Sequence, residues 1–397
     1  MQTVRFLHAA LAQALPTVHA RRLTALMCTV AALLQGRRLT LTGLGRAMPG
    51  SAYPKHAIKR VDRLLGNPHL QAECPLFYWA MLRDVLGALQ HPLILVDWSP
   101  IDAPGRYFLL RAALPVAGRS LAVYERVHDR EGCPRCQAHL LQALAALLPA
   151  GCTPILVTDA GFRRPWLQAV QAQGWYYVGR VRNRDLFRIG TQPWAPVTGL
   201  YAQASTSPKA LGTVEMTRCQ PFVTRLYSVK QPAHGRRHRR ISGRIARDKR
   251  SRVHGRRERE PWLLASNLPE TRWNAAQVVA LYKHRMQIEE GFRDVKSAPL
   301  GLGLELHRSH CPKRIEVLLL IAALANYLIV LVGLRARQLG HERRFQSNSV
   351  RHKRILSLWR LGLEYGRKHA TALSGNVLED LERRLRYETQ QQCRVEG

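Results

Sequence analysis

Acidic residues are scarce in this sequence. Its 397 residues include 27 Asp and Glu against 61 Lys and Arg, so the formal net charge is +34. An imbalance of that size cannot come from one local segment, and it predicts a polyanionic partner. Nucleic acid is the first candidate and an anionic membrane surface is the second. A coating protein of the ribosomal type is as basic, but 46% hydrophobic content over this length is enough for the cores of two or three domains.

A disulfide framework is also missing. Eight cysteines are scattered along a long chain, a pattern unlike that of small secreted domains, and this favours a reducing cytosol. One cluster, His128, Cys133, Cys136 and His139, contains residue types that bind zinc. It lacks the second, separated pair of ligands that zinc modules usually have. A polar loop between a strand and a helix is the simpler interpretation, and zinc binding is the alternative.

Uninterrupted hydrophobic segments long enough to span a membrane are absent too. Residues 5–20 begin like a secretory signal, but polar residues interrupt the apolar stretch, which favours an amphipathic first helix. Residues 315–334 approach the length of a membrane span, yet Glu316 and Asn326 fall inside them. A fully buried core helix explains this segment as well as a membrane span does. We therefore expect no association with a membrane.

The most informative pattern lies in residues 282–296, Tyr-Lys-His-Arg-Met-Gln-Ile-Glu-Glu-Gly-Phe-Arg-Asp-Val-Lys. The segment has no Gly or Pro before its tenth residue, so we expect one continuous helix. On a helix Tyr282, Arg285 and Glu289 share one face, and Lys296 follows two turns later on the same face. One acid with two bases and a phenol suits a metal-bound phosphate. A solvated face with ion pairs is the alternative for this segment alone.

Two further carboxylates follow apolar segments. Residues 93–96 (Leu-Ile-Leu-Val) precede Asp97, and residues 154–158 (Pro-Ile-Leu-Val-Thr) precede Asp159. Such runs predict buried strands, and an Asp at or just past the carboxyl end of a strand lies where α/β sheets bind ligands. Turn chemistry or helix capping would explain either Asp by itself. Two such acids and a helical Glu match two-metal phosphoryl transfer, because Mg²⁺ and Mn²⁺ prefer oxygen ligands and keep open positions for water and phosphate.

Together these residues resemble the DDE transposases of bacterial insertion sequences that carry the YREK signature. Asp97, Asp159 and Glu289 are similar to the three acids, and the spacing Tyr-x₂-Arg-x₃-Glu-x₆-Lys from Tyr282 to Lys296 is similar to the signature. The branch found beside a tetracycline-resistance composite transposon is the most similar. The likeness runs from the first helices to about residue 365, and shorter motifs support it at residues 97–99, 158–162, 262–269, 285–290 and 301–304.

The resemblance implies a reaction and its cofactor. Asp97, Asp159 and Glu289 would bind two Mg²⁺ ions, with Mn²⁺ as a possible substitute. One ion would activate water or a DNA 3′-OH, and the other would stabilise the leaving 3′ oxygen. The expected activity is cut-and-paste transposition of an insertion sequence, with nicking, hairpin formation and strand transfer. A non-catalytic or degenerate DNA-binding relative is the alternative.

The resemblance also implies roles for residues around the acids. Arg285 and Lys296 would hold phosphates near a flipped base. Tyr282 could in principle be a recombinase nucleophile, but its place in an acid-centred motif favours phosphate clamping. Trp262 would stack on a base extruded from the duplex, although an isolated Trp is usually part of a core.

The predicted fold class is α/β, with an RNase H-like catalytic core. Residues 1–85 are expected to form an all-helical, DNA-end-binding domain, and residues 90–344 the catalytic domain. Within the latter, residues 184–262 are expected to be a β-rich, Arg-rich insertion. Residues 345–397 would be a helical C-terminal region. The resemblance implies a bacterial, cytoplasmic protein associated with the nucleoid.

The first domain contains a pattern typical of a helix-turn-helix-like unit. Residues 39–46 lead into a turn at 49–51, and a basic helix follows over 53–65. Four basic residues of that helix could face DNA: Lys55, Lys59, Arg60 and Arg63. A solvated basic helix is the alternative. The resemblance favours binding of double-stranded DNA at the inverted repeats of the element ends.

The catalytic core is expected to follow the RNase H-like order. Strands are predicted at 93–97, 106–113, 119–127, 154–159 and 175–182, with helices near 136–148 and 165–173. Three strands, a helix, a strand, a helix and a strand follow one another in this order. The resemblance to the family's fold, and not the pattern itself, implies that Asp97 and Asp159 lie on adjacent strands.

Two later segments are candidates for contacts with partners. Residues 236–259 contain twelve Lys and Arg and two acids, which favours contact with target or flanking DNA over a dispensable loop. The resemblance implies that the C-terminal region helps subunits assemble, so we expect a homodimer in the synaptic complex. Five apolar residues could form that interface or pack on the chain's own core: Leu356, Leu358, Trp359, Leu361 and Leu363.

Overall fold

The computed structural model describes residues 2–102, 105–182, 185–232, 260–350, 352–369 and 375–393. These form two compact units. Unit 1 comprises Met1–Pro154 and His284–Arg394, and unit 2 comprises Ile155–Lys283. The Arg-rich segment 236–259, with its predicted DNA contact, lies outside the described residues.

Unit 1 begins with five helices, as expected for the first 85 residues: α1 (Gln2–Ala14), α2 (Ala20–Gly36), α3 (Leu41–Arg46), α4 (Pro54–Leu65) and α5 (Pro68–Gly87). Helix α1 is amphipathic, with its buried residues spaced three and four apart. The Thr40 side chain accepts a hydrogen bond from the Gly43 amide and so caps α3. A Cβ at Gly45 would lie 2.6 Å from Cα of Ile58, so glycine permits the close crossing of α3 and α4.

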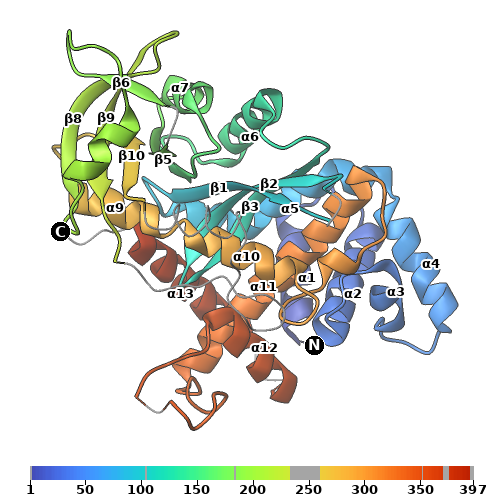
Figure 1. Ribbon diagram of the computed structural model, residues 1–397. Coiled ribbons are helices and arrows are strands. Elements are labelled where there is room, and N and C mark those ends of the chain that lie inside the picture. Colours follow the sequence, from blue (N-terminus) through green and yellow to red (C-terminus); the bar gives the residue numbers. More distant parts are fainter. Residues whose placement is uncertain are drawn as a thin grey trace, which may run out of the picture. The chain divides into compact units, whose positions relative to one another are not determined.

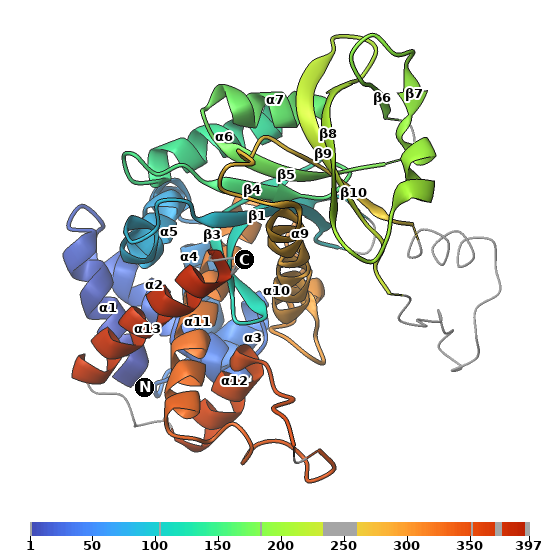
Figure 2. The same ribbon diagram turned by 90° about the vertical axis from the view of Figure 1, so that its left-hand side faces the viewer.

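The long apolar segment forms α11 (Pro312–Gln338), which contacts α2, α5, α12 and strand β3 (Figures 1 and 2). It is long and apolar enough to span a membrane, but 89% of its most apolar window is buried inside the protein. Both polar interruptions have partners. Asn326 accepts a hydrogen bond from the Trp359 indole at 2.9 Å, and Glu316 pairs with Arg126 at 3.1 Å. Helix α11 is therefore a core helix.

Unit 1 ends with α12 (Leu358–Lys368) and α13 (Gly375–Cys393). A Cβ at Gly362 would lie 2.0 Å from the Ile329 carbonyl oxygen, so α12 packs very closely on α11. Leu358, Trp359 and Leu361 are at most 3% exposed. These apolar residues and Leu363, also buried, pack on the chain's own core and offer no free interface.

The strands of unit 1 are β1 (Leu93–Pro100), β2 (Phe108–Val116) and β3 (Arg119–His128), paired antiparallel in the order β3-β2-β1. Helix α6 (Pro134–Leu147) follows β3 and contacts it. The expectation that Asp97 lies at the carboxyl end of its strand was wrong, because β1 continues to Pro100. Pairing with Phe108–Arg111 of β2 holds those last residues extended.

Unit 2 is built on a sheet with the order β4-β5-β10-β9-β8-β6-β7. Its strands are β4 (Ile155–Thr158), β5 (Tyr176–Val181), β6 (Leu186–Arg188), β7 (Ala195–Pro196), β8 (Lys209–Met216), β9 (Phe222–Val229) and β10 (Trp262–Ser266). Strands β4 and β5 are parallel, and the β-rich character predicted for residues 184–262 is present in the described part. Helices α7 (Arg164–Ala172) and α9 (Ala275–Lys283) lie on opposite faces of this sheet (Figures 1 and 2).

The segment 282–296 does not form the single helix that we expected. Helix α9 ends at Lys283, and α10 (Met286–Lys296) begins after a turn at His284 and Arg285. The Gln287 side chain accepts a hydrogen bond from the Gly118 amide and donates one to Gln392 of α13. These tertiary contacts fix the start of α10 independently of α9, and they override local helix propensity. The boundary between the two units falls at the same turn.

Candidate active site

Asp97 lies within β1, after four fully buried residues. Its side chain is 13% exposed. One carboxylate oxygen, Oδ1, accepts a hydrogen bond from the Trp98 amide at 2.8 Å. The other, Oδ2, lies 3.3 Å from Nη1 of Arg285. The apolar strand thus holds a single carboxylate at the protein surface with little freedom to turn.

Glu289 lies in the first turn of α10, where the positive end of the helix dipole favours a carboxylate. Its side chain is 42% exposed, and Oε1 lies 2.6 Å from Nη2 of Arg285. Arg285 therefore joins Asp97 to Glu289 through two nitrogens of one guanidinium. The structure brings together three residues that the sequence separates by up to 192 positions.

Lys296 ties the other end of α10 to the same strand. Its ammonium group donates hydrogen bonds to the Ser99 hydroxyl at 2.6 Å and to the Pro100 carbonyl at 3.1 Å. Burial is the main cause that lowers the pKa of Lys296, and repulsion from Arg111 adds to it, while Glu305 and Asp97 act in the opposite direction. Helix α10 is thus attached to β1 near its first and last residues.

The middle of α10 rests on strands β2 and β3. A Cβ at Gly291 would lie 2.5 Å from the Ser120 Oγ, so no larger residue fits there without a shift. Arg119 pairs with Asp294 at 2.6 Å and with Glu290 at 3.4 Å. Burial raises the pKa of Asp294 to about 6, although the nearby Arg119 charge opposes the shift. The close approach of Gly291 to Ser120 and the Arg119–Asp294 pair hold the middle of α10 against the sheet.

Asp159 lies in unit 2. It directly follows β4, as predicted, and is half-buried. Its Oδ1 accepts a hydrogen bond from the Gly161 amide at 2.8 Å, so the carboxylate shapes the turn that leads to α7. The other carboxylate oxygen, Oδ2, is not the acceptor in this turn hydrogen bond.

Trp262 and Tyr282 also belong to unit 2, and they contact each other. Trp262 opens β10 and Tyr282 lies near the end of α9. Their ring centroids are 4.9 Å apart, and the rings meet edge to face at 73°. Tyr282 is only 3% exposed, whereas Trp262 is half-buried. Tyr282 therefore supports the indole ring, in addition to any contact with phosphate.

The acids of unit 1 fit a divalent cation. Carboxylate oxygens are the donors that Mg²⁺ and Mn²⁺ prefer. Asp97 and Glu289 already share one cationic group, the Arg285 guanidinium, so both point toward a common positive charge. Because Glu289 is well exposed, water and phosphate can reach this place.

The chain matches one family of known proteins. The family model of the transposase DDE domain matches residues 89–328, which is more than half of the chain. The chain belongs to the transposase DDE domain family. No curated protein matches it. Its place in the family makes it a DNA-binding enzyme of transposition and recombination, of the insertion-sequence type, from a family that generally depends on divalent metal ions.

The DNA-binding residues predicted for the first domain of this transposase lie on the outer face of α4. Lys55, Lys59, Arg60 and Arg63 are exposed, while the opposite face buries Val61 and neighbouring apolar residues. Helices α3 and α4 form where the sequence predicted a helix-turn-helix-like unit. A row of cations on one helix face is a form that binds DNA phosphates.

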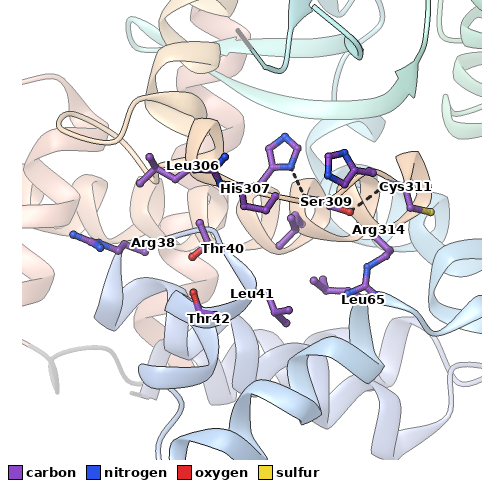
Figure 3. A pocket seen from close by; sticks show the side chains of 13 residues that line it. Arg38, Thr40, Leu41, Thr42, Leu65, Leu306, His307, Ser309, Cys311 and Arg314 are labelled. Carbon is purple, nitrogen blue, oxygen red and sulfur yellow. Dashed lines mark hydrogen bonds between the residues drawn. The ribbon is translucent and has the colours of Figure 1, made fainter. Parts of the chain in front are cut away.

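A pocket of about 670 Å³ lies beside the helix-turn-helix-like unit of α3 and α4 (Figure 3). Arg38, Thr40 and Thr42 line it from the start of α3, and Arg314 lines it from α11. The segment between η2 (Leu304–Leu306) and α11 completes the lining, and His307 there accepts a hydrogen bond from the Ser309 amide at 3.2 Å. The pocket thus joins the predicted end-binding helices of the transposase to the segment that follows α10.

In the transposase, the residues of the His128 cluster lie where β3 leads through a polar loop into α6. His128 ends β3, and Cys133 is the N-cap of α6, where its sulfur accepts a hydrogen bond from the Cys136 amide. Burial lowers the pKa of His128 to about 4. In the part of the chain that the structure describes, no three or more His, Cys, Asp and Glu side chains are grouped to hold a metal ion.

Sequence reasoning missed a buried polar group behind the site. Arg111 of β2 and Glu125 of β3 form an ion pair with a nitrogen–oxygen distance of 2.5 Å, and Tyr78 of α5 donates to Glu125 at 2.9 Å. The signal was a single Arg within the apolar run Phe-Leu-Leu-Arg-Ala-Ala-Leu over residues 108–114. The run alone does not show which residue lies opposite this arginine.

Proposed function

We propose that this transposase carries out cut-and-paste transposition of an insertion sequence of the YREK branch. The relationship that supports this best is the one among Asp97, Arg285 and Glu289, because the signature arginine joins two of the three predicted acids. In this proposal residues 1–85 bind the inverted repeats, residues 90–344 form an RNase H-like catalytic domain, and the chain acts as a homodimer in the synaptic complex. The expected place of action is the bacterial nucleoid.

Asp97 and Glu289 would hold metal ions in the proposed site, with Asp159 as the third ligand residue. Bound Mg²⁺ or Mn²⁺ would supply Lewis-acid activation of the attacking hydroxyl and charge stabilisation of the leaving oxygen. The protein's part is to orient the carboxylates. The Trp98 amide does this for Asp97, and the helix dipole does it for Glu289.

Arg285 and Lys296 would bind the DNA strand next to the cleaved bond. Both are cations at the surface of β1, one at each end of α10. When a phosphate arrives, Arg285 can exchange its carboxylate partners for phosphate oxygens, since a guanidinium binds either pairwise. Trp262, supported by Tyr282, would stack on a base turned out of the duplex, worth about 1–3 kcal/mol.

The proposed reaction consists of four phosphoryl-transfer steps at the end of the element. Water first nicks the element end and frees a 3′-OH. That hydroxyl attacks the opposite strand and closes a hairpin, which water reopens. The 3′-OH of the excised end then attacks target DNA. No side chain becomes covalently attached to DNA, so Tyr282, which is buried, is not required as a nucleophile.

The test uses the full chain and linear DNA that carries the element's own ends, with Mg²⁺, analysed on a denaturing gel. We expect hairpinned ends from the wild type and none from Glu289→Gln. Glu290→Gln is the matched control, because Glu290 is the adjacent acid on α10 and pairs with Arg293 and Arg119. End binding without cleavage in both Mg²⁺ and Mn²⁺ would place the chain in the non-catalytic class. A covalent protein–DNA adduct would indicate a serine or tyrosine recombinase.

A further inference from the structure

One face of the β1–β2–β3 sheet carries an acid, a base and an acid in a row. In the strand register Asp97 lies opposite Arg111, and Arg111 lies opposite Glu125. Opposed residues of antiparallel strands project their side chains from the same face. The arginine therefore stands between the catalytic acid that we propose and a second, buried carboxylate.

This arginine is deeply buried and firmly held. The side chains of Arg111 and Glu125 are 4% and 1% exposed, and their nearest atoms are 2.5 Å apart. The hydroxyl of Tyr78 donates to the other oxygen of Glu125 at 2.9 Å, and burial raises the pKa of Tyr78 well above its usual value. Burying two charges has a large desolvation cost, and apolar residues of the same volume often give equal stability. The arrangement suggests a role beyond general stability.

Helix α10 rests on the Arg111 guanidinium. The ring of Phe292 lies 4.7 Å from it, as in a cation–π contact. A Cβ at Gly291 would lie 3.4 Å from Arg111 Nη1. Phe292 is three residues beyond Glu289, so the two are neighbours on the helix surface. A shift of the guanidinium would therefore be transmitted to Glu289 through one helical turn.

We propose that Arg111 is a positioning residue for DNA cleavage. Held by Glu125 and Tyr78, it fixes the height of α10 above the sheet, and so fixes Glu289 relative to Asp97. This inference rests on the proposed function for its catalytic consequence, but the seating of α10 is a property of the DNA-free chain. A misplacement of about 1 Å costs on the order of 100-fold in rate, which makes the helix height a sensitive quantity.

Two full-chain variants separate positioning from a merely structural role. Arg111→Met leaves Glu125 buried without its cation and is expected to lower thermal stability. The double variant Arg111→Met with Glu125→Leu removes both charges and is expected to regain stability. If Arg111 only stabilises the fold, the double variant will regain wild-type α10 and cleavage as well. If Arg111 positions α10, the double variant will regain neither the wild-type α10 nor cleavage, because the contact between Arg111 and Phe292 is still missing.

The measurements are thermal melting, hydrogen–deuterium exchange of the α10 peptide, end binding and the rate of nicking in Mg²⁺. In the double variant we expect normal melting, exchange of α10 faster by about tenfold, and nicking slower by about 10–100-fold with unchanged end binding. Arg111→Lys should restore part of the nicking rate, since it retains a cation on the ring. Arg126→Met is the matched control. Arg126 is the next residue after Glu125 on β3, projects from the opposite face and pairs with Glu316 instead.

Wild-type exchange of α10 in a stable double variant would overturn the inference, and so would wild-type nicking. If the wild type itself does not nick, the proposed function fails, but the exchange of α10 still decides whether Arg111 seats the helix. If the double variant does not fold, Tyr78→Phe takes its place, because it removes only one hydroxyl. Exchange of α10 should then rise about threefold, and an unchanged value would overturn the inference.

Discussion

Arg285 Nη1 lies 3.3 Å from Oδ2 of Asp97 in the DNA-free chain. The side chain that we propose as a phosphate clamp therefore contacts the carboxylate that we propose as a metal ligand, while its other nitrogen holds Glu289 at 2.6 Å. A metal ion in the proposed site would compete with Arg285 for the same oxygens. DNA that draws the guanidinium onto a phosphate would free the acids, so DNA and metal binding should favour each other.

Arg285→Gln should tighten Mn²⁺ binding to the DNA-free protein. Removing one competing cation near two partly exposed acids is worth about 1 kcal/mol, or roughly a fivefold change in dissociation constant. The loss of the free-ion signal in electron paramagnetic resonance measures this affinity without any cleavage. Arg293→Gln serves as the control, since Arg293 is on the same helix but pairs with Glu290. Equal or weaker Mn²⁺ binding in Arg285→Gln would contradict the competition.

Gly291→Ala should slow nicking while end binding is retained, because the new Cβ would lie 2.5 Å from the Ser120 Oγ and would raise α10 from the sheet. The clash has one main source, so Ser120→Ala in the same chain should restore most of the rate. The Ser120 Cβ would remain 3.8 Å away, an ordinary contact. Single-turnover nicking assays of the two single variants and the double variant test this. Failure of Ser120→Ala to rescue would mean that the helix height is not what Gly291 controls.

Much of the fold was predictable because local patterns coincide with tertiary structure. The five core strands and the two helices between them appear within a few residues of their expected places, since each apolar run is buried in the sheet. The core helix around residues 315–334 and the basic helix α4 were also predicted. In these segments hydrophobic periodicity and burial give the same answer.

The errors arose where distant contacts decide the structure. The absence of Gly and Pro permits a helix through His284, but the Gln287 contacts with Gly118 and Gln392 start a new one. Likewise Arg111 is visible in the sequence, but its pairing with Glu125 depends on strand register, which shifts at a bulge between Ala112 and Ala113. Sequence patterns indicated that Arg285 and Glu289 share one helix face, but not that Arg285 also contacts Asp97.

The stability of the chain should depend on pH through Asp294. Burial raises the pKa of this carboxyl from 3.8 to about 6, so the folded state binds the proton more tightly than the unfolded state. The contribution of the protonated Asp294 carboxyl to stability is therefore present in full below pH 4 and is lost as the pH rises through 6. Asp294→Asn stays neutral at every pH. The free energy of unfolding of this variant, relative to that of the wild type, should therefore increase by on the order of 2 kcal/mol between pH 4 and pH 7. Urea unfolding at several pH values measures this. A constant difference across that range would show that Asp294 does not titrate on unfolding.

As the pH rises, binding of end DNA should weaken at a lower pH than it would with a lysine of ordinary pKa. Burial lowers the pKa of Lys296, with repulsion from Arg111 as the next cause, and only the ammonium form attracts phosphate. Lys296→Arg keeps its charge at every accessible pH and should move the loss of binding to higher pH. Fluorescence anisotropy of a labelled end without metal provides the measurement. Coincident pH profiles for the two proteins would remove Lys296 from the DNA contact.

Tyr282 and Trp262 make the last prediction, because their rings contact each other at 4.9 Å. Tyr282→Phe keeps the edge-to-face contact and removes only the hydroxyl, whereas Tyr282→Ala also removes the support of the indole. If support of Trp262 is the main role of Tyr282, the Phe variant should form hairpins nearly as well as the wild type. The Ala variant should match Trp262→Ala, with a loss of about tenfold from weaker base stacking. A 2-aminopurine at the extruded position reports base flipping directly, since its fluorescence is quenched by stacking on an indole. Loss of hairpins in the Phe variant with normal flipping would instead assign the phenol hydroxyl to the phosphate.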